Sequence, residues 1–324
     1  MTEQINPIEI DNNTTEIVKN IETEQSNIEN KTSVETPENK NIWNNYEKFG
    51  ISNDGSMFNK PISDKNLFGT EQQNVMSNGK IEDIKQQELT DCWLLSSTKA
   101  LAQTDIGKEA IKNAIDANHE GTAKDPYQIT IFNTRGEKQT INVTKSDLVD
   151  KGYSVGDLDM NLIEAAVEKY FDSEGITAED KLFPDRSISG KSNNVDKYSI
   201  GYMLTGKTGK GLTTENIAPK NKEYYSPMTK EAFDEMIKNF ADNPNSTTLT
   251  CAFKPPSFIA KLFSSNNNAA QIENHEYYIK EVIKDDKGNP SKILYVNSWD
   301  TTIVYEKSYN NFFKNLAQIQ GFTL

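Results

Sequence analysis

The stretch from Gln86 to Ser97, QQELTDCWLLSS, decides how the rest of the chain is interpreted. It turns apolar at Cys92, and the apolar spacing predicts a helix from Cys92 to Ala102. A thiol in the first turn of a helix meets free backbone N–H groups and the positive end of the helix dipole, and both favour the thiolate. The alternative interpretation is a small core cysteine on an amphipathic helix.

The chain holds only two histidines that could act as a base on this thiol. His119 lies in a loop between a predicted helix and a predicted hairpin, and we interpret it as a solvated loop residue. His275 lies where a polar loop enters a predicted strand, and Asn297 follows 22 residues later at the end of the partner strand. A hairpin brings these two residues together. An Asn carbonyl that accepts from one imidazole nitrogen leaves the other facing a thiol, as in Cys–His–Asn catalysis.

Two of the three tryptophans neighbour these candidates. Trp93 follows Cys92 directly. Trp299 lies two residues beyond Asn297, on the same strand face if the strand continues. An indole ring there would shield the His–Asn hydrogen bond from water and strengthen it. The alternative for Trp299 is an ordinary tryptophan of a β-sheet, and we count both tryptophans as supporting residues.

Further helices and strands are expected on both sides of Cys92. Caps and apolar periodicity predict helices over 108–117 (after Thr104-Asp105), over 158–172, after Thr229, and over 309–317. Alternation predicts strands over 127–132, 140–143, 247–253, 277–283 and 293–296, and a polar loop over 257–274. The first half is therefore mainly helical and the second mainly β, with GKTGKG from Gly206 to Gly211 as a candidate boundary.

Three parts are expected along the chain. Residues 1–80 form a polar tail or arm, and the first 45 or so lack the large apolar side chains needed to fold. A helical subdomain follows over 81–208 and carries the nucleophile. A β-rich subdomain over 209–324 carries His275 and Asn297. A plain tail, an autoinhibitory segment and an export signal are all open roles for the first part.

The charge and the cysteine content of the chain limit the classes of partner that we expect. The chain carries 35 basic and 48 acidic residues, a net charge of −13. Nucleic-acid binding normally needs a basic face, so we expect no such partner. No stretch approaches the roughly 20 apolar residues of a membrane span, and no signal peptide is recognised, so we expect a cytoplasmic protein by default, with non-classical export left open. Cys92 and Cys251 are too few for a disulfide framework.

The run QQELTDCWLLS over 86–96 resembles the active-site motif of the calpain family of cysteine peptidases, in which Gln, Leu, Asp, Cys and Trp hold these relative places. Asp91 thereby joins the residues expected to support the site. His275 resembles the residue of the family's histidine strand, and Asn297 with Trp299 matches its Asn-x-Trp. Weaker likenesses between about 81 and 324 are Glu168-Lys-Tyr, Leu204-Thr-Gly206, Leu249-Thr-Cys-Ala (which implies a structural Cys251) and the segment 308–324.

The resemblance implies an α+β fold with a papain-like two-subdomain cysteine peptidase core, a helical subdomain followed by a β-rich subdomain with the cleft between them. It implies that Cys92 attacks a peptide carbonyl, that His275 activates the thiol and protonates the leaving amine, and that Asn297 orients His275. Gln86 and the Cys92 backbone N–H would hold the oxyanion. The expected substrate is an extended polypeptide, and the expected state is a monomer.

Calcium is left open as a cofactor. Animal members of the family use Ca²⁺, whereas this sequence has no helix–loop–helix calcium loop. The sequence itself requires no cofactor and leaves the metal ligands unassigned.

Two alternatives stay open. A papain-like acyl transferase or glutamine deamidase uses the same thioester intermediate. A catalytically inactive binding module is supported by Gln87, Thr90 and Asn274, which stand where the family commonly has glycine. The retained Gln86, Cys92, His275 and Asn297 oppose it.

Overall fold

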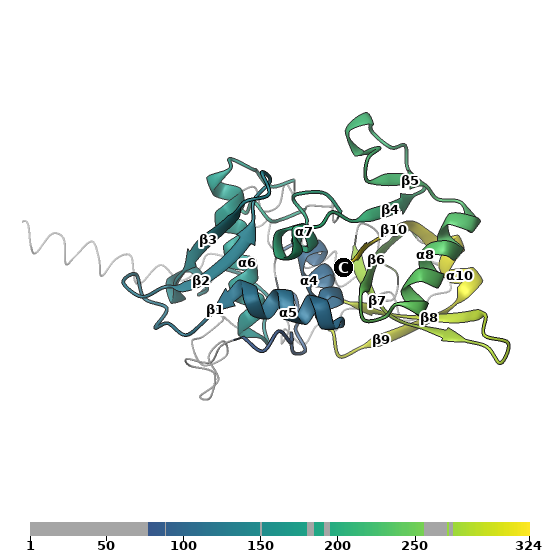
Figure 1. Cartoon of the computed structure of the whole chain (residues 1–324), viewed down its shortest axis with the longest axis horizontal. Helices are drawn as coiled ribbons and strands as arrows, with labels where there is room; N and C mark the ends of the chain where they lie inside the picture. Colours follow the sequence, from purple (N-terminus) through teal and green to yellow (C-terminus); the bar gives the residue numbers. More distant parts are fainter. Residues whose placement is uncertain are drawn as a thin grey trace, which may run out of the picture. The chain divides into compact units, whose positions relative to one another are not determined.

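The computed structural model describes residues 77–87, 89–149, 151–179, 185–190, 195–255, 271 and 275–324. The chain divides into two compact units, Met1–Ile51 and Ser52–Leu324, and all of these residues belong to the second. The predicted tail, most of the predicted arm and nearly all of the polar loop at 257–274 lie outside the described residues. The second unit combines helices with two β-sheets, which confirms the α+β class (Figure 1).

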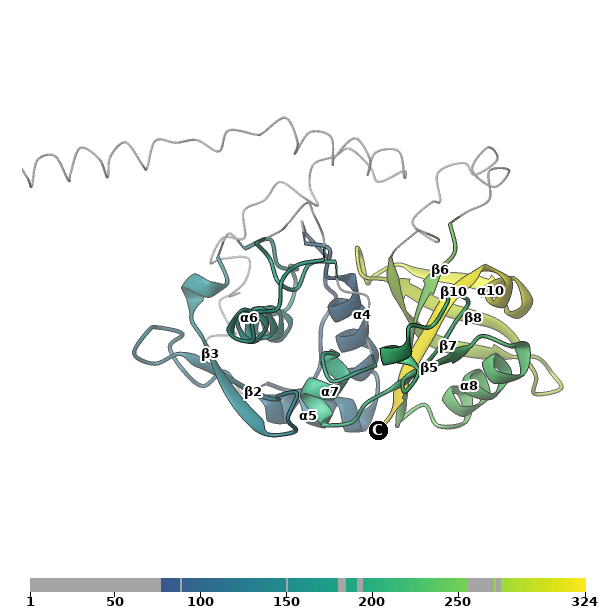
Figure 2. The same cartoon turned by 90° about the horizontal axis from the view of Figure 1, so that it is seen from above.

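The first group of elements is mainly helical. In chain order these are α4 (Cys92–Leu101), α5 (Asp105–Ala114), β1 (Ile115–Asp116), β2 (Tyr127–Phe132), β3 (Lys138–Val143), the 3₁₀ turn η1 (Lys145–Asp147), α6 (Leu158–Ser173) and α7 (Ile200–Thr205). The strands form an antiparallel sheet in the order β1-β2-β3, with Tyr127 opposite Val143, which confirms the predicted hairpin. Helix α6 packs against β2 and β3 (Figure 2).

Side-chain caps fix where these helices begin. Thr104 accepts a hydrogen bond from Gly107 N at 2.9 Å, and Asp157 accepts one from Met160 N at 3.0 Å. The prediction of a helix over 108–117 was wrong at both ends. The cap at Thr104 starts α5 earlier, and Ile115 leaves the helix because it pairs with Ile129 of β2.

The second group of elements is mainly β. Its members are β4 (Lys210–Thr213), the 3₁₀ turn η2 (Pro219–Asn221), β5 (Tyr225–Pro227), α8 (Lys230–Asp242), β6 (Thr247–Phe253), β7 (Glu276–Lys284), β8 (Pro290–Asn297), β9 (Val304–Ser308), α10 (Tyr309–Asn315) and β10 (Leu316–Thr323). The strands form one sheet in the order β5-β4-β10-β6-β7-β8-β9. The β4–β5 pair is parallel and the other pairs are antiparallel.

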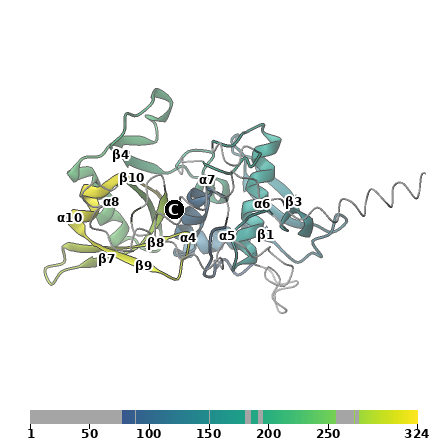
Figure 3. The same cartoon turned by 180° about the vertical axis from the view of Figure 1, so that it is seen from behind.

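Helices cover both faces of this seven-stranded sheet. Helix α8 packs on β6 and β7 and α10 on β8 and β9, burying one face (Figure 3). On the opposite face α4 packs on β6 and β7, where Ala100 meets Tyr278 and Val296. Alternate side chains of β6 and β7 therefore point to α4 on one face and to the helical layer on the other.

The end of α10 differs from the prediction. The helix stops at Asn315 rather than Ala317, and Leu316–Thr323 continues as β10 between β4 and β6. Position 321 of β10 must be glycine because the neighbouring strand passes close to it. A Cβ at this position would lie 1.9 Å from the backbone oxygen of Thr248.

An aromatic cluster fills the layer between the sheet and its helices. The Phe253 ring centroid lies 5.2 Å from Tyr277, 5.2 Å from Tyr295 and 5.3 Å from Phe312, all at edge-to-face angles. Phe253 itself is 2% exposed. The cluster joins strands β6, β7 and β8 to helix α10. It therefore holds the strands beside the site against a helix that covers them.

None of the helices in the part of the chain that the structure describes is long and apolar enough to cross a membrane.

Candidate active site

Cys92 is the first residue of α4, and a buried helix holds it in place. Every residue of α4 is buried, and the backbone oxygen of Asp91 accepts hydrogen bonds from Leu94 N at 2.8 Å and Leu95 N at 3.1 Å. The Cys92 N–H makes no hydrogen bond within the described residues, as expected for the first turn of a helix. This N–H is therefore available to a ligand beside the thiol.

His275 and Asn297 meet at the end of the β7–β8 pair. Tyr277 stands opposite Asn297 in the sheet register, and His275 precedes Tyr277 by two residues on the same strand face. The His275 Nε2 lies 2.6 Å from the Asn297 Oδ1, which also accepts a hydrogen bond from Trp299 N at 2.8 Å. Because the amide oxygen accepts both bonds, His275 Nε2 carries a proton, and Nδ1 is the acceptor of the neutral ring.

Aromatic rings exclude water from this pair. The His275 ring centroid lies 4.8 Å from Trp299 and 5.0 Å from Tyr277. His275 is 5% exposed and Asn297 2%. The Trp299 ring thus contacts the imidazole, and in a site of low dielectric the His–Asn hydrogen bond is stronger than in water.

The thiol lies next to the residue that follows His275. The backbone N–H of Glu276 faces the Cys92 sulfur, and one turn further along α4 the Ser96 Oγ donates to the Glu276 oxygen at 2.9 Å. Within the described residues no hydrogen bond joins the Cys92 thiol directly to His275. The structure therefore brings His275 and Asn297 together and places the Cys92 thiol against the backbone of the residue that follows His275.

Burial keeps both groups uncharged. Desolvation raises the pKa of Cys92 to about 12, and the nearby carboxyls of Glu276 and Asp91 add to the rise. Desolvation also lowers the pKa of His275 to about 4, against the opposing hydrogen bond to Asn297. The first turn of a helix was expected to favour thiolate, but desolvation outweighs it. At neutral pH the site holds a thiol beside a neutral imidazole.

The depressed pKa of His275 predicts acid sensitivity. In the unfolded chain His275 has its ordinary pKa near 6.5 and binds a proton below that pH. In the folded chain it binds this proton only near pH 4, so the free energy of unfolding decreases as pH falls from 6.5 to 4. We expect the wild type to lose about 3 kcal/mol relative to His275→Gln between pH 6.5 and pH 4. Urea unfolding at several pH values measures this difference.

His119 provides the control for that measurement. It lies on the surface with its Nδ1 2.6 Å from Asp125 Oδ1, and this hydrogen bond raises its pKa. Its contribution is therefore present at low pH and fades as pH rises. A buried neutral His275 would be contradicted by either of two results. In one, His275→Gln loses as much unfolding free energy between pH 6.5 and pH 4 as the wild type does. In the other, His119→Gln changes this loss more than His275→Gln does.

Gln86 lies beside the site but is already engaged. Its Nε2 donates to the Leu89 oxygen at 2.7 Å and to Asp91 Oδ1 at 3.2 Å, and its Oε1 accepts from Ser298 Oγ at 2.8 Å. Both amide hydrogens are thus used internally. For Gln86 to stabilise an oxyanion, one of the two bonds must open.

The remaining predicted residues have structural contacts. Trp93 is 1% exposed, donates from Nε1 to the Ile188 oxygen at 2.8 Å and stacks on Phe171. Cys251 is a free, buried thiol of β6. Of the three glycine replacements, Asn274 lies outside the described residues.

The sequence interpretation missed Ser298 and Glu276. β8 ends at Asn297, so the strand does not continue to Trp299, and Ser298 lies in the turn between them. The backbone oxygen of Ser298 accepts from Gln86 N at 3.1 Å, a contact over more than 200 residues for which the sequence offers no signal. Glu164 was missed as well, because a glutamate in an amphipathic helix gives no sign of burial.

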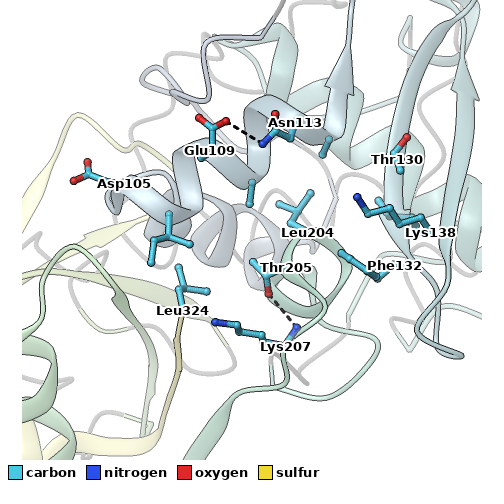
Figure 4. A pocket seen from close by; sticks show the side chains of 14 residues that line it. Asp105, Glu109, Asn113, Thr130, Phe132, Lys138, Leu204, Thr205, Lys207 and Leu324 are labelled. Carbon is cyan, nitrogen blue, oxygen red and sulfur yellow. Dashed lines mark hydrogen bonds between the residues drawn. The ribbon is translucent and has the colours of Figure 1, made fainter.

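A cavity lies apart from these residues. It has a volume of about 540 Å³ and lies between α5, β2 and α7, near Leu324 (Figure 4). Acidic Asp105 and Glu109 face it together with Lys138 and Lys207. None of Cys92, His275 and Asn297 lines it, so it bears on no step of the chemistry.

Within the described residues, no three His, Cys, Asp or Glu side chains gather as metal ligands would. Calcium stays open as a cofactor, as the sequence leaves it.

No protein-family model and no curated protein matches this sequence.

Proposed function

We propose that this chain is a cysteine endopeptidase with a calpain-like catalytic core of the papain-like two-subdomain type. Cys92, His275 and Asn297 would hydrolyse peptide bonds of extended polypeptides. The observation that supports this most directly is the 2.6 Å contact between His275 Nε2 and Asn297 Oδ1 beneath Trp299. It leaves Nδ1 of His275 as a proton acceptor, and the backbone of the next residue, Glu276, faces the thiol.

The neutral resting state defines the proton path. As the Cys92 sulfur bonds to the substrate carbonyl carbon, its proton passes to His275 Nδ1. The imidazolium is stabilised by Asn297 Oδ1 through Nε2. His275 then returns the proton to the leaving amine as the carbon–nitrogen bond breaks. Water, deprotonated by His275, hydrolyses the thioester and regenerates the thiol.

The oxyanion needs donors that are fixed before the reaction. The Cys92 backbone N–H is one, since no described residue accepts from it. Gln86 would be the second after releasing the Leu89 oxygen, now at 2.7 Å, while its bond to Asp91 Oδ1 at 3.2 Å is kept. Each such donor contributes about 3–4 kcal/mol to catalysis in comparable sites.

A catalytically inactive binding domain is the second candidate. Two observations favour it: the pKa of Cys92 is raised to about 12 by burial, and no hydrogen bond joins the described Cys92 and His275 side chains. If substrate binding moves the thiol toward His275 Nδ1, the two groups become hydrogen-bonded and the imidazole can take the proton, so neither observation would then oppose a peptidase.

Cleavage of an unfolded protein tests the proposal. Wild type and Cys92→Ala are incubated with it in calcium and in chelator, and fragments are followed by mass spectrometry. We expect fragments from the wild type alone, and the two buffers show whether calcium is required. Ammonia release without fragments would identify a deamidase. No product from either folded protein would support the binding domain.

A further inference from the structure

Two carboxyl groups share one buried site directly behind Cys92. Asp91 precedes the nucleophile at the start of α4 and is 1% exposed, and Glu164 of α6 is fully buried. Each side chain shifts the pKa of the other as a hydrogen-bonding neighbour, although no donor meets Asp91 Oδ2 among the described residues. Two ionised carboxylates have no proton between them, so a hydrogen bond here needs a proton on one of the two.

Glu164 is arranged to accept hydrogen bonds. Ser154 N donates to its Oε1 at 2.9 Å, and Ser154 Oγ donates to its Oε2 at 2.6 Å. Asn161 Nδ2 also donates to Oε2 at 3.2 Å. All three partners present hydrogens, which is the arrangement that suits an ionised carboxylate on Glu164.

Asp91 lacks a matching set of donors. Its Oδ1 accepts from Gln86 Nε2 at 3.2 Å, while its Oδ2 is buried and meets no donor among the described residues. A hydrogen on Oδ2 would give this atom the bond to Glu164 that it otherwise lacks.

The surrounding charges do not neutralise the pair. Arg186 is the nearby cation, but its Nε and Nη2 bind Glu168 at 2.6 and 2.8 Å. The other titratable neighbours are Tyr153, whose hydroxyl donates to Glu168, and the Cys92 thiol. Burial and the neighbouring Glu164 raise the pKa of Asp91 well above its ordinary range.

We propose that Asp91 and Glu164 share a single proton carried on Asp91 Oδ2, and that the protonated Asp91 is a positioning residue that holds the Gln86 amide beside Cys92. Proton sharing rests on the burial of the two carboxyls, on the unpartnered Asp91 Oδ2 and on the donors around Glu164, whereas the positioning of Gln86 for catalysis rests on the proposed peptidase function.

Amide substitutions distinguish where the proton lies. Asp91→Asn keeps an acceptor for Gln86 and supplies an N–H toward Glu164, so it mimics the protonated acid. Glu164→Gln places an NH₂ among groups that already donate. In the Cys92→Ala background at pH 6, we expect Glu164→Gln to raise the unfolding constant at least tenfold and Asp91→Asn to leave it within about threefold of its parent or lower it.

The pH dependence gives a second signature. The folded chain keeps a proton on Asp91 that the unfolded chain loses, so stability falls as pH rises above the ordinary Asp value. Relative to Asp91→Asn, the unfolding constant of the parent should rise with pH, by up to tenfold per unit. Destabilisation by Asp91→Asn with Glu164→Gln tolerated would move the proton to Glu164. Equal stabilisation by both, or no difference in pH slope, would overturn proton sharing.

Kinetics in the Cys92-containing protein test the positioning role separately. We expect Asp91→Ala to lower kcat at least tenfold with little change in KM, and Asp91→Asn to recover most of that loss. Equal kcat losses in the two variants would overturn positioning while the stability result stands. The wild type could be inactive while Asp91→Asn and Glu164→Gln still differ in stability as expected. That result would refute the peptidase proposal and the positioning role, but not the shared proton.

Discussion

Replacing Cys92 with alanine is expected to lower kcat/KM for peptide cleavage by about 10⁴-fold or more, because the residual rate comes from binding and the oxyanion site alone. His275→Ala should cost nearly as much, since a thiol whose pKa is about 12 is unreactive without a base. The double variant should be no worse than either single one, because the two groups act as a unit. Initial rates on a defined peptide substrate measure all three.

Cys251→Ala is the matched control. It removes the other buried thiol, which lies in β6 within the hydrophobic core of the β-rich part. Some stability should be lost while kcat/KM stays within about threefold, as expected for a thiol that does not contact the reacting groups. Full activity in Cys92→Ala, or equal losses in both cysteine variants, would contradict Cys92 as the nucleophile.

Phe253→Ala is expected to reduce the free energy of unfolding by about 3–5 kcal/mol, the usual result of emptying a fully packed aromatic position. The ring contacts Tyr277, Tyr295 and Phe312, whose neighbours cannot all collapse into the space. Because Tyr277 stands opposite Asn297, the His275–Asn297 geometry should loosen as well. Urea unfolding followed by circular dichroism measures the loss.

Phe313→Ala provides the comparison on the same layer. Phe313 is half-buried and contacts Phe233 at the edge of the cluster, with ring centroids 5.0 Å apart. Partial burial predicts a loss of about 1–2 kcal/mol. Losses of similar size in both variants would show that the layer is not packed around Phe253.

The local parts of the fold followed from the sequence. Thr229 caps α8 by accepting from Ala232 N, as predicted, and the strand over 247–253 has the predicted bounds. Patterns of this kind depend on neighbours within a few residues. His275 and Asn297 could likewise be brought together because a single hairpin joins them.

The missed parts depend on distant partners. The sequence of 316–323 gives only a weak strand signal, because Gln320 occupies a buried position where an apolar residue would be expected. Its side chain is satisfied by Glu276, to which it donates at 2.8 Å, and by Tyr225, whose hydroxyl donates to it at 2.5 Å. Neither partner can be inferred from the segment 316–323 alone.

Contacts at short and at long range both make the site differ from a simple motif. The Gln86 amide, expected to face the oxyanion, is held in the structure by Leu89 and Asp91, three and five residues away. The burial that sets the pKa of Cys92 comes in part from β7, nearly 200 residues away along the chain. A helix start predicts a thiolate only while water still reaches it.

The central place of β10 in its sheet has a consequence for folding. His275 directly precedes β7 and Asn297 ends β8, and in the strand order these two strands are linked to β4 and β5 through β6 and β10. Until residues 316–323 insert, β5-β4 and β6-β7-β8-β9 are two separate sheets, each with an unpaired edge. Non-local sheet pairing waits for its last partner. Insertion of β10 is therefore the folding step that joins the strands beside the site to the rest of the sheet.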